Sequence, residues 1–235
     1  MDAPMDTPPD GTRVTPTQRA DVPVAVIDDE ELHRRAIRRL LQNKGFSVRD
    51  FACLDGALRS GALLGCELIL LDVMLGRESG IAACRRLREL GYSGGIIMVS
   101  GLGQSEVKAQ ALDAGADDYV TKPAGGEELL ARLRSVLRRV QPAARAGRAG
   151  GQLRQRMVLE ALKSPSQRRM FRQLSAARGQ PVARDALKAF GLENPRATDK
   201  ALEKHIERTR EILKPLGVRI ETVVGTGYSC PTRFD

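Results

Sequence analysis

The chain contains 235 residues, of which 42% are apolar and 3% aromatic, so its length favours two modest domains with aliphatic cores. Its formal charge of +9 is uneven: residues 153–235 carry 17 Lys and Arg against 9 Asp and Glu, whereas residues 22–137 carry 15 against 16. The four cysteines show neither a disulfide framework nor CxxC spacing, and the N-terminus does not resemble a signal peptide. No apolar stretch is long enough to span a membrane. These features argue against a secreted or membrane protein and predict a cytoplasmic one.

The first two-thirds of the chain alternate between short apolar segments and amphipathic patterns. Residues 1–21 precede them, are rich in Pro, Asp and Thr, and are expected to be disordered. The continuous apolar character of the short segments is typical of strands buried on both faces. The regular alternation predicts an α/β fold with a doubly wound, five-stranded parallel sheet. The predicted strands are residues 22–27, 46–51, 67–71, 96–100 and 119–121, and the predicted helices are residues 31–44, 54–60, 80–90, 105–114 and 127–140.

The next segment divides the chain. Residues 141–151 consist of Pro, Gly, Ala and Arg apart from Gln141, and they predict a flexible linker between a domain at 22–140 and a domain at 152–235. Residues 152–163 fit a helix or, at 157–159, a short strand. The helical spacing of Leu153, Met157 and Leu162 favours the helix.

The C-terminal residues predict three helices and a β-hairpin. Ser164, Pro165 and Gln167 match a capping box with Pro at the first helical position. Three helices followed by a hairpin is the layout of a winged helix-turn-helix. The predicted helices are residues 164–178, 183–190 and 198–213, and the predicted hairpin joins 218–224 to 228–230.

Polar side chains lie at the carboxyl ends of four predicted strands. Asp28 and Asp29 follow the first strand, Asp72 the third and Lys122 the fifth, while Ser100 ends the fourth. In an open parallel sheet such ends meet at the edge where ligands bind. Clustered carboxylates repel one another, and Mg²⁺ is suited to relieve the repulsion. Asp72 is then the candidate nucleophile for an aspartyl phosphate, with Lys122 and Ser100 contacting the phosphoryl oxygens.

On these residues the first domain resembles the receiver domains of response regulators. The matching segments are AVIDDEE, LILLDVML, MVSG, ALDAGADDYVTKP and EELLARLRSVLRR. The resemblance implies a flavodoxin-like fold that is phosphorylated by a sensor histidine kinase. It also implies Asp72 as the phosphoacceptor, Mg²⁺ bound by Asp28, Asp29, Asp72 and the carbonyl of Met74, and Ser100, Tyr119 and Lys122 as phosphate-stabilising and switch residues.

Two positions depart from the family pattern. Gly76 stands where Pro is usual, which predicts a looser loop around Met74. Ala124 replaces a frequent Phe after Lys122 and Pro123, whose peptide bond is often cis in the family. Neither departure removes a charged group of the pocket.

The helix predicted over 198–213 indicates nucleic-acid binding. Basic residues recur every four positions on one face, which suits the major groove, although interleaved acidic residues leave an ion-paired surface helix as the alternative. HIERTREIL and RIETVVGTGYSC resemble the recognition helix and wing of OmpR/PhoB-type regulators, which favours double-stranded DNA as the partner. The candidate DNA contacts are Arg196, Lys200, Lys204 and Arg208, and by resemblance Arg210 and Thr226.

The resemblance implies further partners. Residues 192–197 would form a loop offered to RNA polymerase, and the face around the fourth helix and fifth strand would form a phosphorylation-promoted homodimer. The family usually has a four-stranded sheet before the winged helix, but residues 141–163 are poor in β-branched and aromatic residues, so the helix over 152–163 is the candidate to replace it. The candidate dimer residues are Lys108, Asp117, Asp118, Glu128, Arg132 and Arg134.

Two other functions are alternatives to regulated DNA binding. The first is a receiver-controlled adaptor whose basic domain docks on RNA polymerase or another protein rather than reading specific DNA. The second is an aspartate-based phosphohydrolase, which is not expected because Met74 stands where such enzymes carry a second Asp. We therefore expect no enzymatic activity beyond phosphotransfer to the chain itself and slow loss of that phosphoryl group.

Overall fold

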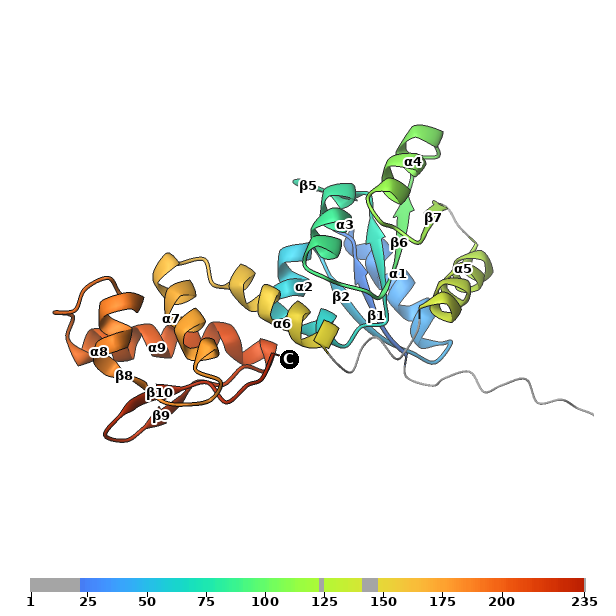
Figure 1. Ribbon diagram of the computed structural model, residues 1–235. Coiled ribbons are helices and arrows are strands. Elements are labelled where there is room, and N and C mark those ends of the chain that lie inside the picture. The colour runs from blue at the N-terminus through green and yellow to red at the C-terminus, as the bar shows by residue number, and fades with distance from the viewer. Residues whose placement is uncertain (1–21, 123–124, 141–147, 235) are drawn as a thin grey trace, which may run out of the picture.

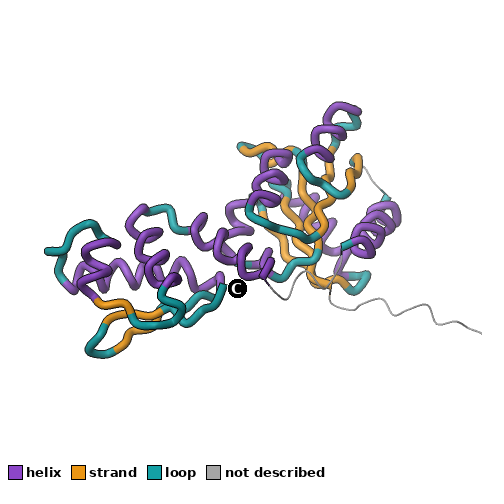
Figure 2. Tube along the Cα trace, viewed as in Figure 1, coloured by secondary structure: helices purple, strands orange, loops and turns teal. Residues whose placement is uncertain are grey.

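The computed structural model describes residues 22–122, 125–140 and 148–234 as two parts joined at the helix α6 (Arg148–Ala161) (Figure 1). The first part is a sheet flanked by helices, and the second is mainly helical with a small sheet along one side (Figure 2). The predictions for residues 1–21, for Pro123 and Ala124, and for a linker over 141–147 lie outside the described residues. No helix within the described ranges has the length and apolar character needed to cross a membrane.

The first part contains a five-stranded sheet in the order β2-β1-β3-β6-β7, in which every neighbouring pair is parallel. The central strand β3 and its neighbour β6 are buried along their whole length, as their continuous apolar runs predict. The strand order reverses direction between β1 and β3, which is where α/β sheets form their ligand crevice. The strands are β1 (Val22–Ile27), β2 (Phe46–Phe51), β3 (Leu68–Asp72), β6 (Gly95–Ser100) and β7 (Asp118–Thr121).

Helices cover both faces of this sheet. One face packs on α1 and α5 through residues such as Ile37, Leu41 and Leu133, and the other packs on α2, α3 and α4 through residues such as Leu54, Leu87 and Ala111. The predicted α/β alternation is confirmed, with element ends shifted by only one or two residues. The helices are α1 (Glu31–Gln42), α2 (Leu54–Ser60), the 3-10 turn η1 (Ala62–Leu64), α3 (Gly80–Glu89), α4 (Ser105–Asp113) and α5 (Gly126–Arg139).

The loop after β3 forms a short hairpin that the sequence did not predict. Its antiparallel strands are β4 (Met74–Leu75) and β5 (Glu78–Ser79). Gly76 begins the turn with a φ of 62°, a conformation favoured by glycine and closed to Pro, whose φ is fixed at about −65°. Gly76 therefore suits the turn of a paired loop, and the looser loop expected from this departure stays a prediction.

The C-terminal part has the layout of a winged helix, with two local differences from the prediction. The helix predicted over residues 183–190 spans residues 184–191, where a short α-helical stretch continues into π-helical turns, and residues 182–183 pair with β10 in the three-stranded sheet β8-β10-β9. Ser164 precedes α7 without a side-chain capping bond, whereas Thr198 caps α9 by accepting a bond from the Ala201 N–H. The elements are α7 (Pro165–Ala176), β8 (Val182–Ala183), α8 (Arg184–Ala186), the π-helical η3 (Leu187–Gly191), α9 (Asp199–Leu213), η4 (Lys214–Leu216), β9 (Glu221–Val223) and β10 (Gly227–Ser229).

Helix α6 confirms the helical interpretation of residues 152–163 and begins inside the predicted linker, at Arg148. It buries Leu153, Met157 and Val158, and it contacts α2 on one side and α9 and η4 on the other (Figure 1). Within the described residues no four-stranded sheet precedes α7, so α6 occupies its place in the chain. The two parts consequently share one apolar cluster.

The two parts approach each other closely at Gly61, just after α2. Gly61 has a φ of 70°, and a Cβ at this position would overlap the backbone carbonyl of Pro215 in η4. We expect Gly61→Ala to lose the roughly 1–2 kcal/mol that a left-handed conformation costs an L-residue, together with a further loss from displacing η4. Denaturant unfolding and interdomain proteolysis measure the two effects.

Gly45→Ala is the matched control for this change. Gly45 has a φ of 85°, but a Cβ added there would meet nothing within 4 Å, so this variant should show the conformational cost alone. Equal destabilisation of the two variants, with unchanged proteolysis between the two parts, would contradict a tight contact at Gly61.

Candidate functional site

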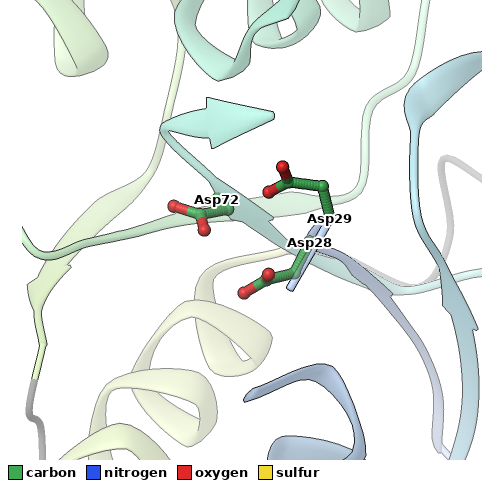
Figure 3. Close-up of side chains that lie close together, drawn as sticks. All are labelled: Asp28, Asp29 and Asp72. Carbon is green, nitrogen blue, oxygen red and sulfur yellow. The ribbon is translucent and has the colours of Figure 1, made fainter. Parts of the chain in front are cut away.

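Three carboxylates lie together at the carboxyl edge of the sheet. Asp28 and Asp29 directly follow β1 and Asp72 ends β3, and Figure 3 shows their side chains converging on one space. Each can place an oxygen within 4.8 Å of the others. Asp28 and Asp72 are buried, whereas Asp29 is exposed at the mouth of the site. The predicted convergence of these strand ends is therefore present.

Lys122 partly compensates the charges of the two buried carboxylates. Its ammonium donates to Asp72 Oδ2 at 2.8 Å and to Asp28 Oδ2 at 3.2 Å. The Lys122 backbone N–H donates to the carbonyl of Ser100 at 2.6 Å, which ties this residue to the end of β6. Lys122, which follows β7, therefore connects the ends of β1 and β3.

The two buried carboxyl groups have opposite pKa shifts. For Asp28, burial would raise the pKa, but hydrogen bonds from His33 and from the Glu30 N–H, together with Lys122, hold it below its ordinary value. For Asp72, burial raises the pKa and the charge of Asp28 adds to this effect, while Lys122 and the Met74 N–H only partly oppose it. Burial lowers the pKa of Lys122, but its bonds to Asp72 and Asp28 outweigh this and raise it. Asp72 is thus the less stabilised carboxylate.

The oxygen donors of this site fit a small divalent cation. Asp72 Oδ1 accepts the Met74 N–H at 3.2 Å, so the hairpin β4–β5 is held against the carboxylates. A Cβ at Gly76 would lie 3.1 Å from Asp29 Oδ2, which places the turn beside the third carboxylate. Lys122 already compensates charge between Asp28 and Asp72, and Mg²⁺ prefers such carboxylate and carbonyl oxygens. The acidic pocket is of the type that binds Mg²⁺ in receiver domains.

The predicted switch residues both contact the loop after β6. Ser100 is fully buried, and its Oγ accepts the Leu102 N–H at 3.0 Å. Tyr119 is also buried, and its hydroxyl donates to the Leu102 carbonyl at 2.5 Å. Ser100 and Tyr119 therefore both hydrogen-bond the backbone of Leu102, one at its N–H and the other at its carbonyl.

His33 belongs to the site although the sequence did not single it out. It lies on the first turns of α1, and its Nδ1 hydrogen-bonds Asp28 Oδ2. His33 lies five residues after Asp28, in the helix that follows β1. A single histidine at such a spacing does not by itself indicate a functional contact, so nothing in the sequence was a reason to select it. The contact makes His33 a positioning residue for Asp28.

The basic face of α9 is exposed, and two of the four acids of this helix pair with residues of the preceding segment. The inward face consists of Leu202, Ile206, Thr209 and Leu213, as predicted. Asp199 pairs with Lys188 at 2.9 Å, and Glu203 pairs with Arg184 at 3.1 Å. Among the described residues no carboxylate pairs with the exposed cations Lys200, Lys204 and Arg208. The charges of Asp199 and Glu203 are thus compensated within the domain, while Glu207 and Glu211 remain exposed beside the basic residues.

Arg210 and Thr226, inferred from the resemblance, lie in different settings. Thr226 is exposed in the wing tip between β9 and β10. Arg210 donates to the carbonyl of Ile220 at 2.8 Å and to Thr222 Oγ1 at 2.8 Å, and its guanidinium lies 5.8 Å from the centre of the Tyr228 ring. Arg210 therefore holds the wing against α9, a role that sequence reasoning missed. Arg196 is exposed in the loop before α9.

Most predicted dimer residues are paired within the chain. Arg132 donates to Asp118 at 3.2 Å and to Glu128 at 3.0 Å. Asp117 accepts from Arg88 and from the Ile96 N–H, each at 2.8 Å, so it holds α3 and β6 together. Lys108 is exposed on α4, and Arg134 is half-buried on α5.

Lys122 has a role that a substitution can measure. Removing the ammonium leaves Asp28 and Asp72 facing each other, so Lys122→Ala should destabilise the metal-free protein by about 1–3 kcal/mol. Added Mg²⁺ should replace the lost positive charge and should raise the unfolding midpoint more in this variant than in the unsubstituted protein. Thermal unfolding with and without Mg²⁺ measures both effects.

Lys108→Ala, which changes an exposed lysine of α4, is the control and should leave the response to Mg²⁺ unchanged. An identical Mg²⁺-induced shift in Lys122→Ala and in the unsubstituted protein would show that this ammonium and a divalent cation do not compensate the same charges.

Comparison with known proteins identifies both parts of the chain. Residues 24–134 match the family described as response regulator receiver domain. The phosphate regulon transcriptional regulatory protein PhoB of Escherichia coli (strain K12) is 30% identical over 226 residues, covering 90% of this chain and 98% of PhoB. The transcriptional regulatory protein DltR of Streptococcus agalactiae is 43% identical over 110 residues, which are 46% of this chain and 49% of DltR.

Among solved structures, a BeF3-activated DrrB receiver domain is 33% identical, covers 50% of this chain and 98% of its own, and has a TM-score of 0.46. The similarity to PhoB extends over both the sheet domain and the winged helix. The chain therefore belongs to the two-component response regulators of the OmpR/PhoB type, and it is a phosphorylation-controlled, DNA-binding transcriptional regulator.

Proposed function

We propose that Asp72 accepts a phosphoryl group from a sensor histidine kinase and that this modification controls DNA binding by α9 and the wing. One observation carries the proposal: the Asp72 carboxylate is buried, lies 2.8 Å from Lys122, and shares its pocket with Asp28 and Asp29. A carboxylate with an adjacent ammonium and a place for a divalent cation is suited to attack phosphorus and to stabilise the charge that develops. Because its partner is DNA, the proposed location is the cytoplasm.

The proposed Mg²⁺ ligands are the carboxylates of Asp28, Asp29 and Asp72 and the carbonyl of Met74. When bound, this ion would neutralise phosphoryl oxygens. His33 and the Glu30 N–H orient Asp28, and the Met74 N–H orients Asp72. Lys122 is the proposed partner of a phosphoryl oxygen. Since Met74 supplies no acid group two residues after Asp72, we propose that the chain has no external substrate and only loses its own phosphoryl group slowly.

Ser100 and Tyr119 are the proposed sensors of the phosphoryl group. The Ser100 hydroxyl has a proton to donate, so it can bond a phosphoryl oxygen on neighbouring β3. Turning toward Asp72 would end its bond with the Leu102 N–H, and Tyr119 holds the carbonyl of that same residue. The loop before α4 is therefore the proposed first element to move.

The proposed DNA interface is the exposed face of α9 with the wing. Lys200, Lys204 and Arg208 offer charge without a carboxylate partner in the described chain, and helices of this kind enter the major groove. Arg210 is a proposed support of the wing rather than a free DNA contact. Arg196 and Thr226 flank the helix from the preceding loop and the wing tip.

We also propose a homodimer through the α4–β7–α5 face and a contact of RNA polymerase with residues 192–197. Dimerisation would exchange the Asp118–Arg132 pair within the chain for pairs between chains, with Lys108 and Arg134 available as further cations. Phe190, which is 65% exposed beside the 192–197 loop, supports a protein partner there.

Asp72→Asn tests the phosphoacceptor. The amide keeps the size of the side chain but is a far weaker nucleophile, so labelling by acetyl phosphate should be lost, as should any increase in mass seen by sedimentation on phosphorylation. Circular dichroism should confirm an intact fold, and Asp50→Asn, which alters a carboxylate outside the pocket, should retain labelling. Persistent labelling of Asp72→Asn would place the phosphoacceptor elsewhere.

Lys204→Ala tests the DNA interface. The loss of one phosphate contact should weaken binding to a duplex selected in vitro by the unsubstituted protein and lower the slope of log affinity against log salt by about 1. Lys44→Ala, a change in the receiver domain, serves as the control. Unchanged affinity and slope for Lys204→Ala would remove α9 from the interface, and an absence of DNA binding at low salt would favour the adaptor alternative.

A further inference from the structure

The two domains are joined by an apolar core that continues through α6. Met157 and Val158 of α6 are buried in one cluster with Leu58 of α2 and with Leu213 and Leu216 of the winged-helix domain. Closely packed cores transmit displacement rather than absorbing it. A shift of α6 against the receiver domain must therefore carry the winged helix with it.

Arg86 lies among three carboxylates beside this core, and Arg59 pairs with one of them, Asp55, at 3.7 Å. The Arg86 guanidinium on α3 is 2.9 Å from Asp55 of α2, 2.5 Å from Glu160 of α6 and 3.7 Å from Glu78 of β5. Burial lowers the pKa of Arg86, but Asp55 and Glu160 outweigh this and raise it, so the charge is permanent. The guanidinium meets Asp55 and Glu160 through Nη2 and Glu78 through Nη1, so a movement that brings Nη1 closer to Glu78 also displaces Nη2 from its two partners.

One of these acids belongs to the loop that carries the phosphoacceptor. Glu78 pairs with Leu75 in the hairpin whose first residue, Met74, donates its N–H to Asp72. Helix α3 begins directly after this hairpin, with the Gly80 N–H bonded to the Val73 carbonyl at 2.8 Å. Gly80 packs so closely that a side chain there would overlap the Asp72 carbonyl. Movement of the backbone at Asp72 must consequently displace the start of α3.

The other end of α3 reaches the interdomain helix. Arg156 of α6 donates to the carbonyl of Glu89, the last residue of α3, where the helix dipole favours a cation. With Arg86 bonded to Glu160, α3 contacts α6 at two points. Helix α3 is thus a rigid connection from the phosphoacceptor to α6.

We propose that Arg86 is a switchable contact through which phosphorylation of Asp72 repositions α6 and changes DNA affinity. The inference rests on the proposed function of Asp72. In the arrangement described, Arg86 holds Glu160 closely and Glu78 at a distance. A phosphoryl group on Asp72 moves the hairpin, Glu78 draws Arg86 from Glu160, and α6 with the winged helix is freed from α3.

The test uses the full chain with Glu160→Gln, which preserves shape but removes the charge. Acetyl-phosphate labelling is measured first, followed by affinity for the in-vitro-selected duplex with and without beryllofluoride. Because the charge attraction between Arg86 and residue 160 is then absent in both states, labelling should be as in the unsubstituted protein, while the change in affinity on activation should shrink by about threefold or more.

Glu89→Gln is the matched control, since Glu89 is an exposed acid of α3 that contributes only its backbone carbonyl to α6. It should keep the full response. The double variant Arg86→Gln/Glu160→Gln should respond like Glu160→Gln alone, because the ion pair between Arg86 and Glu160 is already lost in the single variant.

Three outcomes would overturn the proposal: a full response in Glu160→Gln, an equal loss in Glu89→Gln, or labelling of the unsubstituted protein without a change in its DNA affinity. If the unsubstituted protein is not labelled at Asp72, the proposed phosphoacceptor is wrong. The inference about Arg86 then fails as well, because it depends on phosphorylation of Asp72.

Discussion

The repulsion between two buried carboxylates, Asp28 and Asp72, is the constraint around which the receiver domain is arranged. Lys122 spans them, but one ammonium cannot balance both of these charges and that of Asp29. The surrounding chain supplies further compensation through the Glu30 and Met74 N–H groups and through His33. A site with this residual negative charge favours a divalent cation and reacts strongly to an added phosphoryl group.

The same site is mechanically connected to the rest of the molecule. The hairpin after Asp72, the start of α3 and the loop at Leu102 all contact pocket residues through backbone atoms. A change at the carboxylates therefore acts on main-chain groups as well as on the side chains of Lys122 and His33. Helix α6, which stands where related regulators usually have a sheet, then offers a packed surface against which α3 can act.

In the winged-helix domain, a few basic side chains both pair with acidic residues and hold the wing against the helices. Arg184 pairs with Glu203 and Lys188 with Asp199, while the lysines of α9 face solvent. The guanidinium groups of Arg184 on α8 and Arg210 on α9 lie 5.3 and 5.8 Å from the centre of the Tyr228 ring. Tyr228 of β10 therefore contacts both α8 and α9. The wing and α9 are consequently held together as one surface.

The sequence by itself determined the strands and helices of the receiver domain, the edge at which Asp28, Asp72, Ser100 and Lys122 meet, and the inward face of α9. These features follow from local periodicity and from the rule that parallel strands end on one side, so they can be read along the chain. Only the tertiary structure decided the roles of His33, Arg86 and Arg210, the recruitment of residues 182–183 into a sheet, and the docking of α6 on both domains. Each of these depends on which distant segments pack together, because an Arg or His can pair with many partners and its sequence neighbours do not specify which one lies within reach.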